Sequence, residues 1–162
     1  MAPLIKPGAI IQDDWVKYDR FRSLGGAQRV LASRADLDRY PRFFERSLFE
    51  LGLQLDVDDA VEDIAGWLPR LSLVSLDFPS FADGRAFSQA RLLRERFDYH
   101  AEIRARGEVL RDQLSFMQRC GFTQFSLAEG EDVEQALSAF ADISLSYQPE
   151  PLRQRLDQVV NA

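Results

Sequence analysis

The sequence is poor in cysteine, lysine and histidine, and each shortage argues against a class of chemistry. Its one cysteine, Cys120, cannot form an internal disulfide, so the fold needs no oxidising compartment. Cys120 comes at the end of an expected helix, where the helix dipole disfavours a thiolate, so we expect a buried, unreactive thiol. Only two lysines occur, both before residue 18, which argues against a Schiff-base lysine. The only histidine, His100, precedes an expected strand, where a turn or surface role is more frequent than catalysis.

Several familiar motifs are also missing. There is no G-x-G-x-x-G segment, no Walker A loop, no C-x-x-C pair and no cysteine–histidine set for a metal. The sequence therefore predicts no metal site and leaves any cofactor unknown. No apolar run approaches the roughly 20 residues of a membrane span, and the N-terminus does not resemble a signal peptide. These observations predict a cytoplasmic protein with no membrane partner.

The charge is unevenly distributed. The net charge of −6 argues against a nucleic-acid partner, since nucleic-acid binding requires a basic surface. Eighteen of the twenty basic residues are arginines, and eight of these lie between Arg85 and Arg119 against five acidic residues. Arginine suits bidentate contacts with carboxylate, phosphate or sulfate-like anions. An exposed helix face crossed by ion pairs is the alternative interpretation of this segment.

The length and the hydrophobic pattern indicate one α/β domain over residues 1–162. Strand-like runs alternate with helical patterns, which favours βα units and a mostly parallel sheet. Such units form either a small doubly wound sheet or an incomplete βα barrel. We expect a hairpin and the first strand in residues 1–33, a core motif region in 50–128 and a tail in 149–162.

The individual elements follow from periodicity and from proline and glycine positions. The strongest strand is Leu71–Phe78, which lies between two prolines. Other strands are expected at 29–32, 53–57, 101–105, 122–127 and 144–147, and an N-terminal β-hairpin at 9–18. Helices are expected at 36–49, 61–68, 84–97, 109–121 and 132–140, with a turn at Gly107 before the fourth.

Parallel α/β folds bind ligands beyond the carboxyl ends of their strands, which selects the loops after residues 77, 105 and 127. In the first loop, Asp83 is expected to cap a helix, Gly84 to allow close approach and Arg85 to clamp an anion. In the second, Glu108 and Asp112 are spaced to share a helix face, as acid–base or metal groups or as a solvated face. The predicted anion contacts are Arg85, Arg104, Arg106, Gly84 and Ser88, with Asp77, Asp83, Glu108 and Asp112 as supporting carboxylates.

A longer pattern runs through the same region. It consists of Asp77-Phe78-Pro79, Phe81, Asp83-Gly84-Arg85, Ser88, Ala90-Arg91, Leu93-Arg94, Arg104-Ala105, Gly107-Glu108-Val109-Leu110, Asp112-Gln113 and Arg119-Cys120-Gly121-Phe122. Over roughly residues 50–128 this pattern resembles a bacterial family of unknown function, domain-of-unknown-function family 934. Glu108 stands where relatives often carry Asp. Members are often described as probable oxidoreductases involved in sulfite reduction, so the resemblance implies a pathway but no catalytic residue.

Three hypotheses follow. The first is an accessory protein of assimilatory sulfite or sulfate reduction, which binds a small anion or docks to sulfite reductase components through the arginine-rich segment. The second is an oxidoreductase that uses a dissociable cofactor. The third is a non-catalytic interaction or scaffold domain, whose hairpin at 9–18 extends the sheet of a partner or of a second copy in a homodimer.

Overall fold

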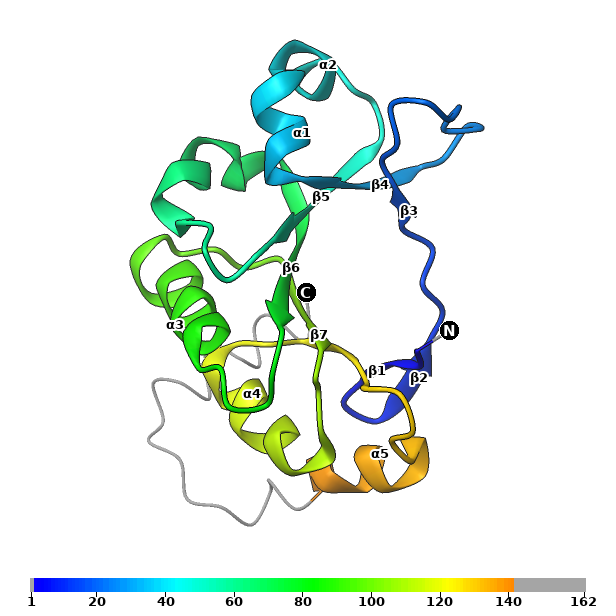
Figure 1. The fold of residues 1–162 in the computed structure, drawn as a ribbon, viewed down its shortest axis with the longest axis vertical. Coiled ribbons are helices and arrows are strands. Elements are labelled where there is room, and N and C mark those ends of the chain that lie inside the picture. The colour runs from blue at the N-terminus through cyan, green and yellow to red at the C-terminus, as the bar shows by residue number, and fades with distance from the viewer. Residues whose placement is uncertain (1, 142–162) are drawn as a thin grey trace.

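The computed structural model describes residues 2–141, which form an α/β fold around one eight-stranded sheet (Figure 1). The strand order is β2-β1-β8-β7-β6-β5-β4-β3. The strands are β1 (Leu4–Lys6), β2 (Ala9–Ile11), β3 (Val16–Lys17), β4 (Arg29–Ser33), β5 (Glu50–Leu55), β6 (Leu71–Phe78), β7 (Glu102–Gly107) and β8 (Gln124–Ser126). The α/β prediction is confirmed. The sheet is mixed rather than mostly parallel as expected, because β3 to β8 pair in parallel while β1 pairs antiparallel with both β2 and β8.

The sheet curls into half a barrel. Its two edge strands, β2 and β3, are separated by residues 12–15 alone. A connection of this length spans at most about 18 Å, whereas eight flat strands would place the edges about 33 Å apart. The short connection is therefore possible only because the sheet bends, and Figure 1 shows it running down the open side of the curl.

The helices cover the outer face of the sheet. They are α1 (Arg34–Arg39), α2 (Pro41–Glu45), the 3₁₀ helix η1 (Val61–Arg70), α3 (Arg85–Arg91), the π-helical turn η2 (Leu92–Arg96), the 3₁₀ turn η3 (Arg111–Gln113), α4 (Leu114–Cys120) and α5 (Val133–Ala141). Among the described residues, none of these helices combines the length and the apolar character needed to cross a membrane.

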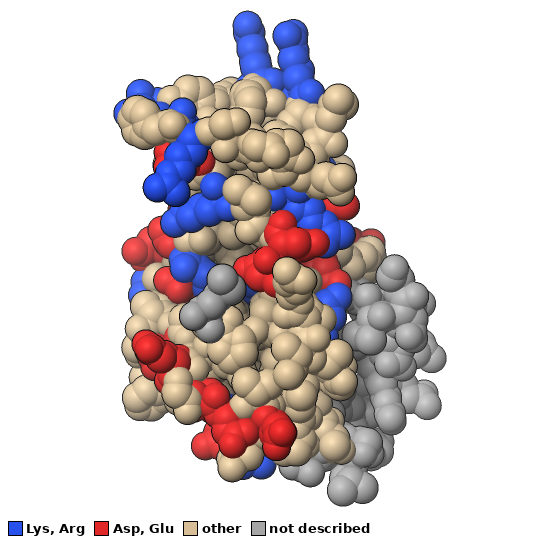
Figure 2. Space-filling view, turned by 90° about the vertical axis from the view of Figure 1, so that its right-hand side faces the viewer, with Lys and Arg blue, Asp and Glu red and all other residues tan. Residues whose placement is uncertain are grey.

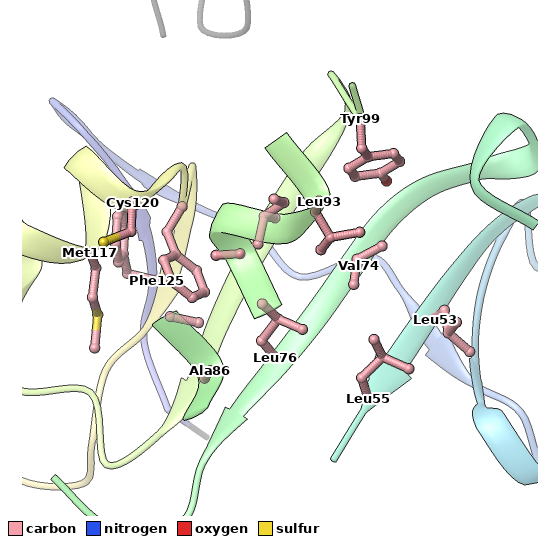
Figure 3. Close-up of a cluster of buried hydrophobic side chains, with 14 of the residues drawn as sticks. Leu53, Leu55, Val74, Leu76, Ala86, Leu93, Tyr99, Met117, Cys120 and Phe125 are labelled. Atoms are coloured by element: carbon pink, nitrogen blue, oxygen red, sulfur yellow. The ribbon is translucent and has the colours of Figure 1, made fainter. Parts of the chain in front are cut away.

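The core lies between these helices and the outer face. Phe78 of β6 stacks against Phe87 of α3, with ring centroids 5.0 Å apart, and Phe125 of β8 packs against Phe140 of α5 at 5.1 Å. Figure 3 shows Cys120 among the buried side chains of this core, so the predicted burial of the thiol is confirmed. Burial raises the pKa of the Cys120 thiol, which keeps it protonated.

The predicted N-terminal hairpin at 9–18 is wrong in its pairing. β2 pairs with β1, across a turn in which Gly8 has a φ of +86°. β3 lies at the opposite edge of the sheet, parallel to β4. Asp13 and Asp14 do not form a tight turn, because their carboxylates bind arginines that lie far away in the sequence.

Two helix predictions also need correction. The helix expected at 36–49 divides at Tyr40, because Pro41 starts a new helix and restricts the residue before it. The strand expected at 53–57 begins earlier, because β5 starts at Glu50 and includes Gly52. The turn expected at Gly107 is confirmed, with a φ of +93°, but the helix expected to carry Val109 and Leu110 begins only at Arg111. The expected strand at 144–147 and the tail at 149–162 lie outside the described residues.

Candidate functional site

Polar side chains line the inner face of the curled sheet. The strand register places Gln54 of β5 opposite Ser75 of β6, Ser75 opposite Arg104 of β7, and Arg104 opposite Gln124 of β8. Since side chains alternate between the two faces of a strand, Asp77 and Arg106 lie on this same face, one step nearer the carboxyl ends. We call the set of Gln54, Ser75, Asp77, Arg104, Arg106 and Gln124 the polar face.

Arg104 is the most buried charged side chain of the polar face, with 6% of its side chain exposed. Its Nε donates to Oε1 of Gln124 at 3.0 Å. Its Nη1 and Nη2 donate to the two carboxylate oxygens of Asp13, at 3.0 and 3.2 Å. The guanidinium therefore holds a planar carboxylate in a bidentate fork, which is the arrangement that arginine adopts with oxyanions.

Arg106 has much looser partners. Its Nη2 lies 3.7 Å from Oδ1 of Asp56 and 3.6 Å from Oδ1 of Asp77, beyond ordinary hydrogen-bonding distance. Its Nε is buried and has no hydrogen-bond partner among the described residues, and the same is true of Oγ of Ser75, a residue with no exposed surface. Buried polar atoms are nearly always paired, so two unpaired ones on one face point to a missing polar partner, such as a ligand or ordered water.

A short segment crosses the open side of the polar face, and we call residues 12–15 the strap. Asp13 binds Arg104, and Asp14 binds Arg29 of β4 with Oδ2 2.8 Å from Nη1. The ring of Trp15 lies against Gly52, where a Cβ would come within 2.8 Å of it. Figure 2 faces this side of the molecule and shows acidic and basic side chains interspersed across its middle. The strap is thus tied to β4, β5 and β7.

Arg85, Asp83, Gly84 and Ser88 form a different arrangement at the start of α3. The Arg85 guanidinium lies 2.7 Å from both Asp83 and Asp58, and it holds the pKa of Asp83 down at about 2. The N-cap is Gly84 and not Asp83, with a φ of −90° and nothing within 4 Å of a Cβ placed there. Ser88 is exposed. Arg85 is thus already paired with the carboxylates of Asp83 and Asp58.

The two remaining predicted carboxylates do not share a helix face. Glu108 lies in the turn before the helix, where its N–H donates to the carbonyl oxygen of Phe78 at 2.8 Å. Asp112 lies in η3, and both residues are exposed. The expectation that the two carboxylates share a helix face is therefore wrong, while their exposure fits the solvated alternative. Among the described residues, no group of three or more His, Cys, Asp or Glu side chains is arranged to hold a metal ion.

Part of the arginine-rich segment is structural. Arg94 donates hydrogen bonds of 2.7 Å to the carbonyl oxygens of Gly121, Tyr99 and Ala101, and burial lowers its pKa to about 10. The Tyr99 hydroxyl in turn donates to the carbonyl oxygen of Leu71 at 3.0 Å, and burial raises the pKa of Tyr99. These contacts hold the turn that leads into β7, so Arg94 has no hydrogen-bonding role at the polar face.

The structure brings together Asp77, Arg104 and Arg106 among the predicted residues, and it adds Ser75 and Asp13. Sequence reasoning missed Ser75 because serine in a buried strand gives no chemical signal by itself. The signal available was its alternation with Val74 and Leu76, which predicts that Ser75 and Asp77 share a face. Asp13 left no such signal, since it lies 91 residues from Arg104.

A hollow lies at the amino ends of β6 and β7. It has a volume of about 360 Å³ and is lined in part by Leu68, Phe97 and Tyr99. At its edge, Nε2 of His100 lies 3.0 Å from Oδ1 of Asp98, and both side chains are mostly exposed. This hollow is separated from the polar face by the length of the strands.

One comparison with known proteins identifies the family. The model of a family described as "Bacterial protein of unknown function (DUF934)" matches residues 52–156. The chain belongs to this family. The DUF934 match includes every residue of the polar face, whereas the strap and β1 to β4 precede it. A search of curated proteins finds no match.

Proposed function

We propose that this DUF934 protein binds a small oxyanion on the polar face, as an accessory protein of assimilatory sulfite or sulfate reduction. The observation that carries the proposal is the pair of buried, unpartnered polar atoms, Nε of Arg106 and Oγ of Ser75. Both are hydrogen-bond donors on the face of the sheet that also carries Arg104, which is the register partner of Ser75. An oxyanion accepts hydrogen bonds from such groups and gains charge assistance from the arginine.

The surroundings of Arg106 favour an exchangeable ligand. Asp56, one of its two carboxylate neighbours, has 72% of its side chain exposed, and neither Asp56 nor Asp77 comes within hydrogen-bonding distance of it. Loose, solvated pairs of this kind contribute little energy. An oxyanion at Arg106 would therefore compete only with weak contacts. The Arg106 side chain is 33% exposed, so it is partly shielded from water.

The family resemblance suggests which anions to test. Relatives are described as involved in sulfite reduction, so sulfite and sulfate come first. Both present several oxygens on a compact centre, so one anion can accept hydrogen bonds from donors on both β6 and β7. The proposed role in the pathway depends on this resemblance, while the proposed anion site depends on the geometry of the polar face.

Isothermal titration of the full chain with sodium sulfite and sodium sulfate tests the anion site. Sodium chloride at equal ionic strength controls for general screening. We expect Arg106→Gln to weaken binding at least about tenfold, the loss of one charge-assisted contact. Arg85→Gln is the matched control, because Arg85 is engaged by Asp83 and Asp58, and it should bind as the unaltered protein does. Equal binding by the two variants would refute the site.

The pathway is tested in cells. A strain that lacks the gene should grow poorly with sulfate or sulfite as the sulfur source and normally with cysteine. Equal growth on all three sources would contradict the role in sulfite reduction and would leave the anion site to be judged by titration.

A further inference from the structure

We propose that the carboxylate of Asp13 is a built-in competitor for the oxyanion site, and that ligand binding displaces it from Arg104 and releases the strap. This inference depends on the proposed function, because it describes how the same site is regulated. Its basis is the placement of Asp13, which comes from a segment that belongs to no strand yet occupies a buried arginine in a bidentate fork.

The fork on Arg104 is a complete anion site that is already filled. Three of its nitrogens are engaged, Nε by Gln124 and the two Nη atoms by Asp13. Arg104 has 6% of its side chain exposed, while Asp13 has 38%, so solvent reaches the carboxylate side of the pair. A ligand can therefore approach the carboxylate from solvent and take over both Nη contacts without unfolding the sheet.

The two arginines are close enough to hold one ligand or two adjacent groups of it. Arg104 and Arg106 lie on the same face of β7, two residues apart, which corresponds to about 6.8 Å along a strand. While Asp13 occupies Arg104, only Arg106 is available to an incoming anion. Once Asp13 leaves, both guanidinium groups and Ser75 face the ligand, and the anion meets two positive charges in place of one.

The strap is suited to this exchange. Its other contacts are the exposed ion pair between Asp14 and Arg29, the packing of Trp15 on Gly52, and the Arg29 guanidinium 6.0 Å above the Trp15 ring. It leads into β3, which has two residues, both exposed, and pairs on one side only. Few buried contacts therefore oppose a local opening of the strap.

The affinity of the site for sulfite reports how strongly the Asp13 carboxylate competes for Arg104. When a binding-competent form is only a fraction of the molecules, the apparent affinity falls by that fraction. If the strap is closed in about nine molecules of ten, removing its carboxylate should tighten sulfite binding about tenfold. Asp13→Asn makes this change. Asp14→Asn is the matched control, because it removes the same charge from the neighbouring strap position without touching Arg104, and its affinity should stay within about twofold of the unaltered protein.

Trp15 provides a second measurement that needs no change at the site. In a Trp67→Phe protein Trp15 is the only tryptophan, and its ring lies against the sheet. Sulfite should shift its emission to the red as the strap leaves, whereas sodium chloride at equal ionic strength should not. This arm decides the question even if Asp13→Asn fails to fold.

The outcomes separate the two proposals. Tighter sulfite binding by Asp13→Asn alone, or a sulfite-dependent red shift of Trp15, supports the competitor. Binding by Asp13→Asn where the unaltered protein binds none supports it as well. If the unaltered protein binds sulfite while Asp13→Asn gains no affinity and Trp15 does not respond, the competitor is refuted and the anion site stands. If neither protein binds sulfite, both proposals fail.

Discussion

Gly107 is the residue on which the geometry of the β7 rim most directly depends. Its φ of +93° is unfavourable for any residue with a side chain, and a Cβ there would overlap the carbonyl oxygen of Phe78. That carbonyl accepts the N–H of Glu108 and thereby ties the end of β7 to the end of β6. The glycine therefore sets where the strand ends and the direction in which the chain leaves the rim.

Gly107→Ala should lower the free energy of unfolding by at least about 2 kcal/mol, since it combines a disfavoured φ with a steric overlap against backbone. Gly66→Ala is the control, because Gly66 lies within η1, has no positive φ and would place its Cβ in open space. It should be neutral or slightly stabilising. Urea denaturation followed by circular dichroism measures both, and equal stability of the two variants would contradict this account of the turn.

At the scale of elements, sequence reasoning succeeded where the signal was local. β6 lies between Pro69 and Pro79 and carries a run of β-favouring residues, so its position was predicted correctly. The pairing of the N-terminal segments failed because the contacts that decide it are distant in sequence. Asp13 binds a residue 91 positions away, and Trp15 packs on a glycine of β5, so neither could be inferred from nearby residues.

The contact between Trp15 and Gly52 gives a test of the strap as an element. A Cβ at Gly52 would come within 2.8 Å of the Trp15 ring and 3.1 Å of Cδ1 of Leu31. Gly52→Ala should therefore push the ring away from β5, at a cost of about 1–2 kcal/mol, as overpacking usually has. In the Trp67→Phe background the emission of Trp15 should shift to the red. Gly84→Ala, where a Cβ has free space, should leave it unchanged; a Gly52→Ala protein with unaltered emission would show that the strap lies elsewhere.

For the molecule as a whole, the sequence predicted the α/β class and the convergence of two strand ends, but it left open whether the sheet is doubly wound or curls as an incomplete barrel. β6 and β7 are parallel neighbours, which brings Asp77 beside Arg106 as the strand-end rule requires. The curl follows from a connection of four residues between opposite edges, and that is a property of the complete strand order. Arg85 was assigned to the same site because strand-end loops usually converge, but neighbouring carboxylates engage it at the start of α3.

The same architecture predicts a gradient of stability across the sheet. β6 lies between β5 and β7, and Leu73, Val74 and Leu76 within it have no exposed surface. At the edge, β3 has two exposed residues, and the strap before it belongs to no strand. Amide hydrogens of β6 should therefore exchange only through global unfolding, while those of residues 12–17 should exchange through local opening at a much lower free energy. Hydrogen exchange followed by mass spectrometry at increasing urea concentrations distinguishes the two, because only global opening depends steeply on denaturant. Protection of residues 12–17 equal to that of β6 would mean that the strap is part of the rigid core and cannot act as a releasable segment.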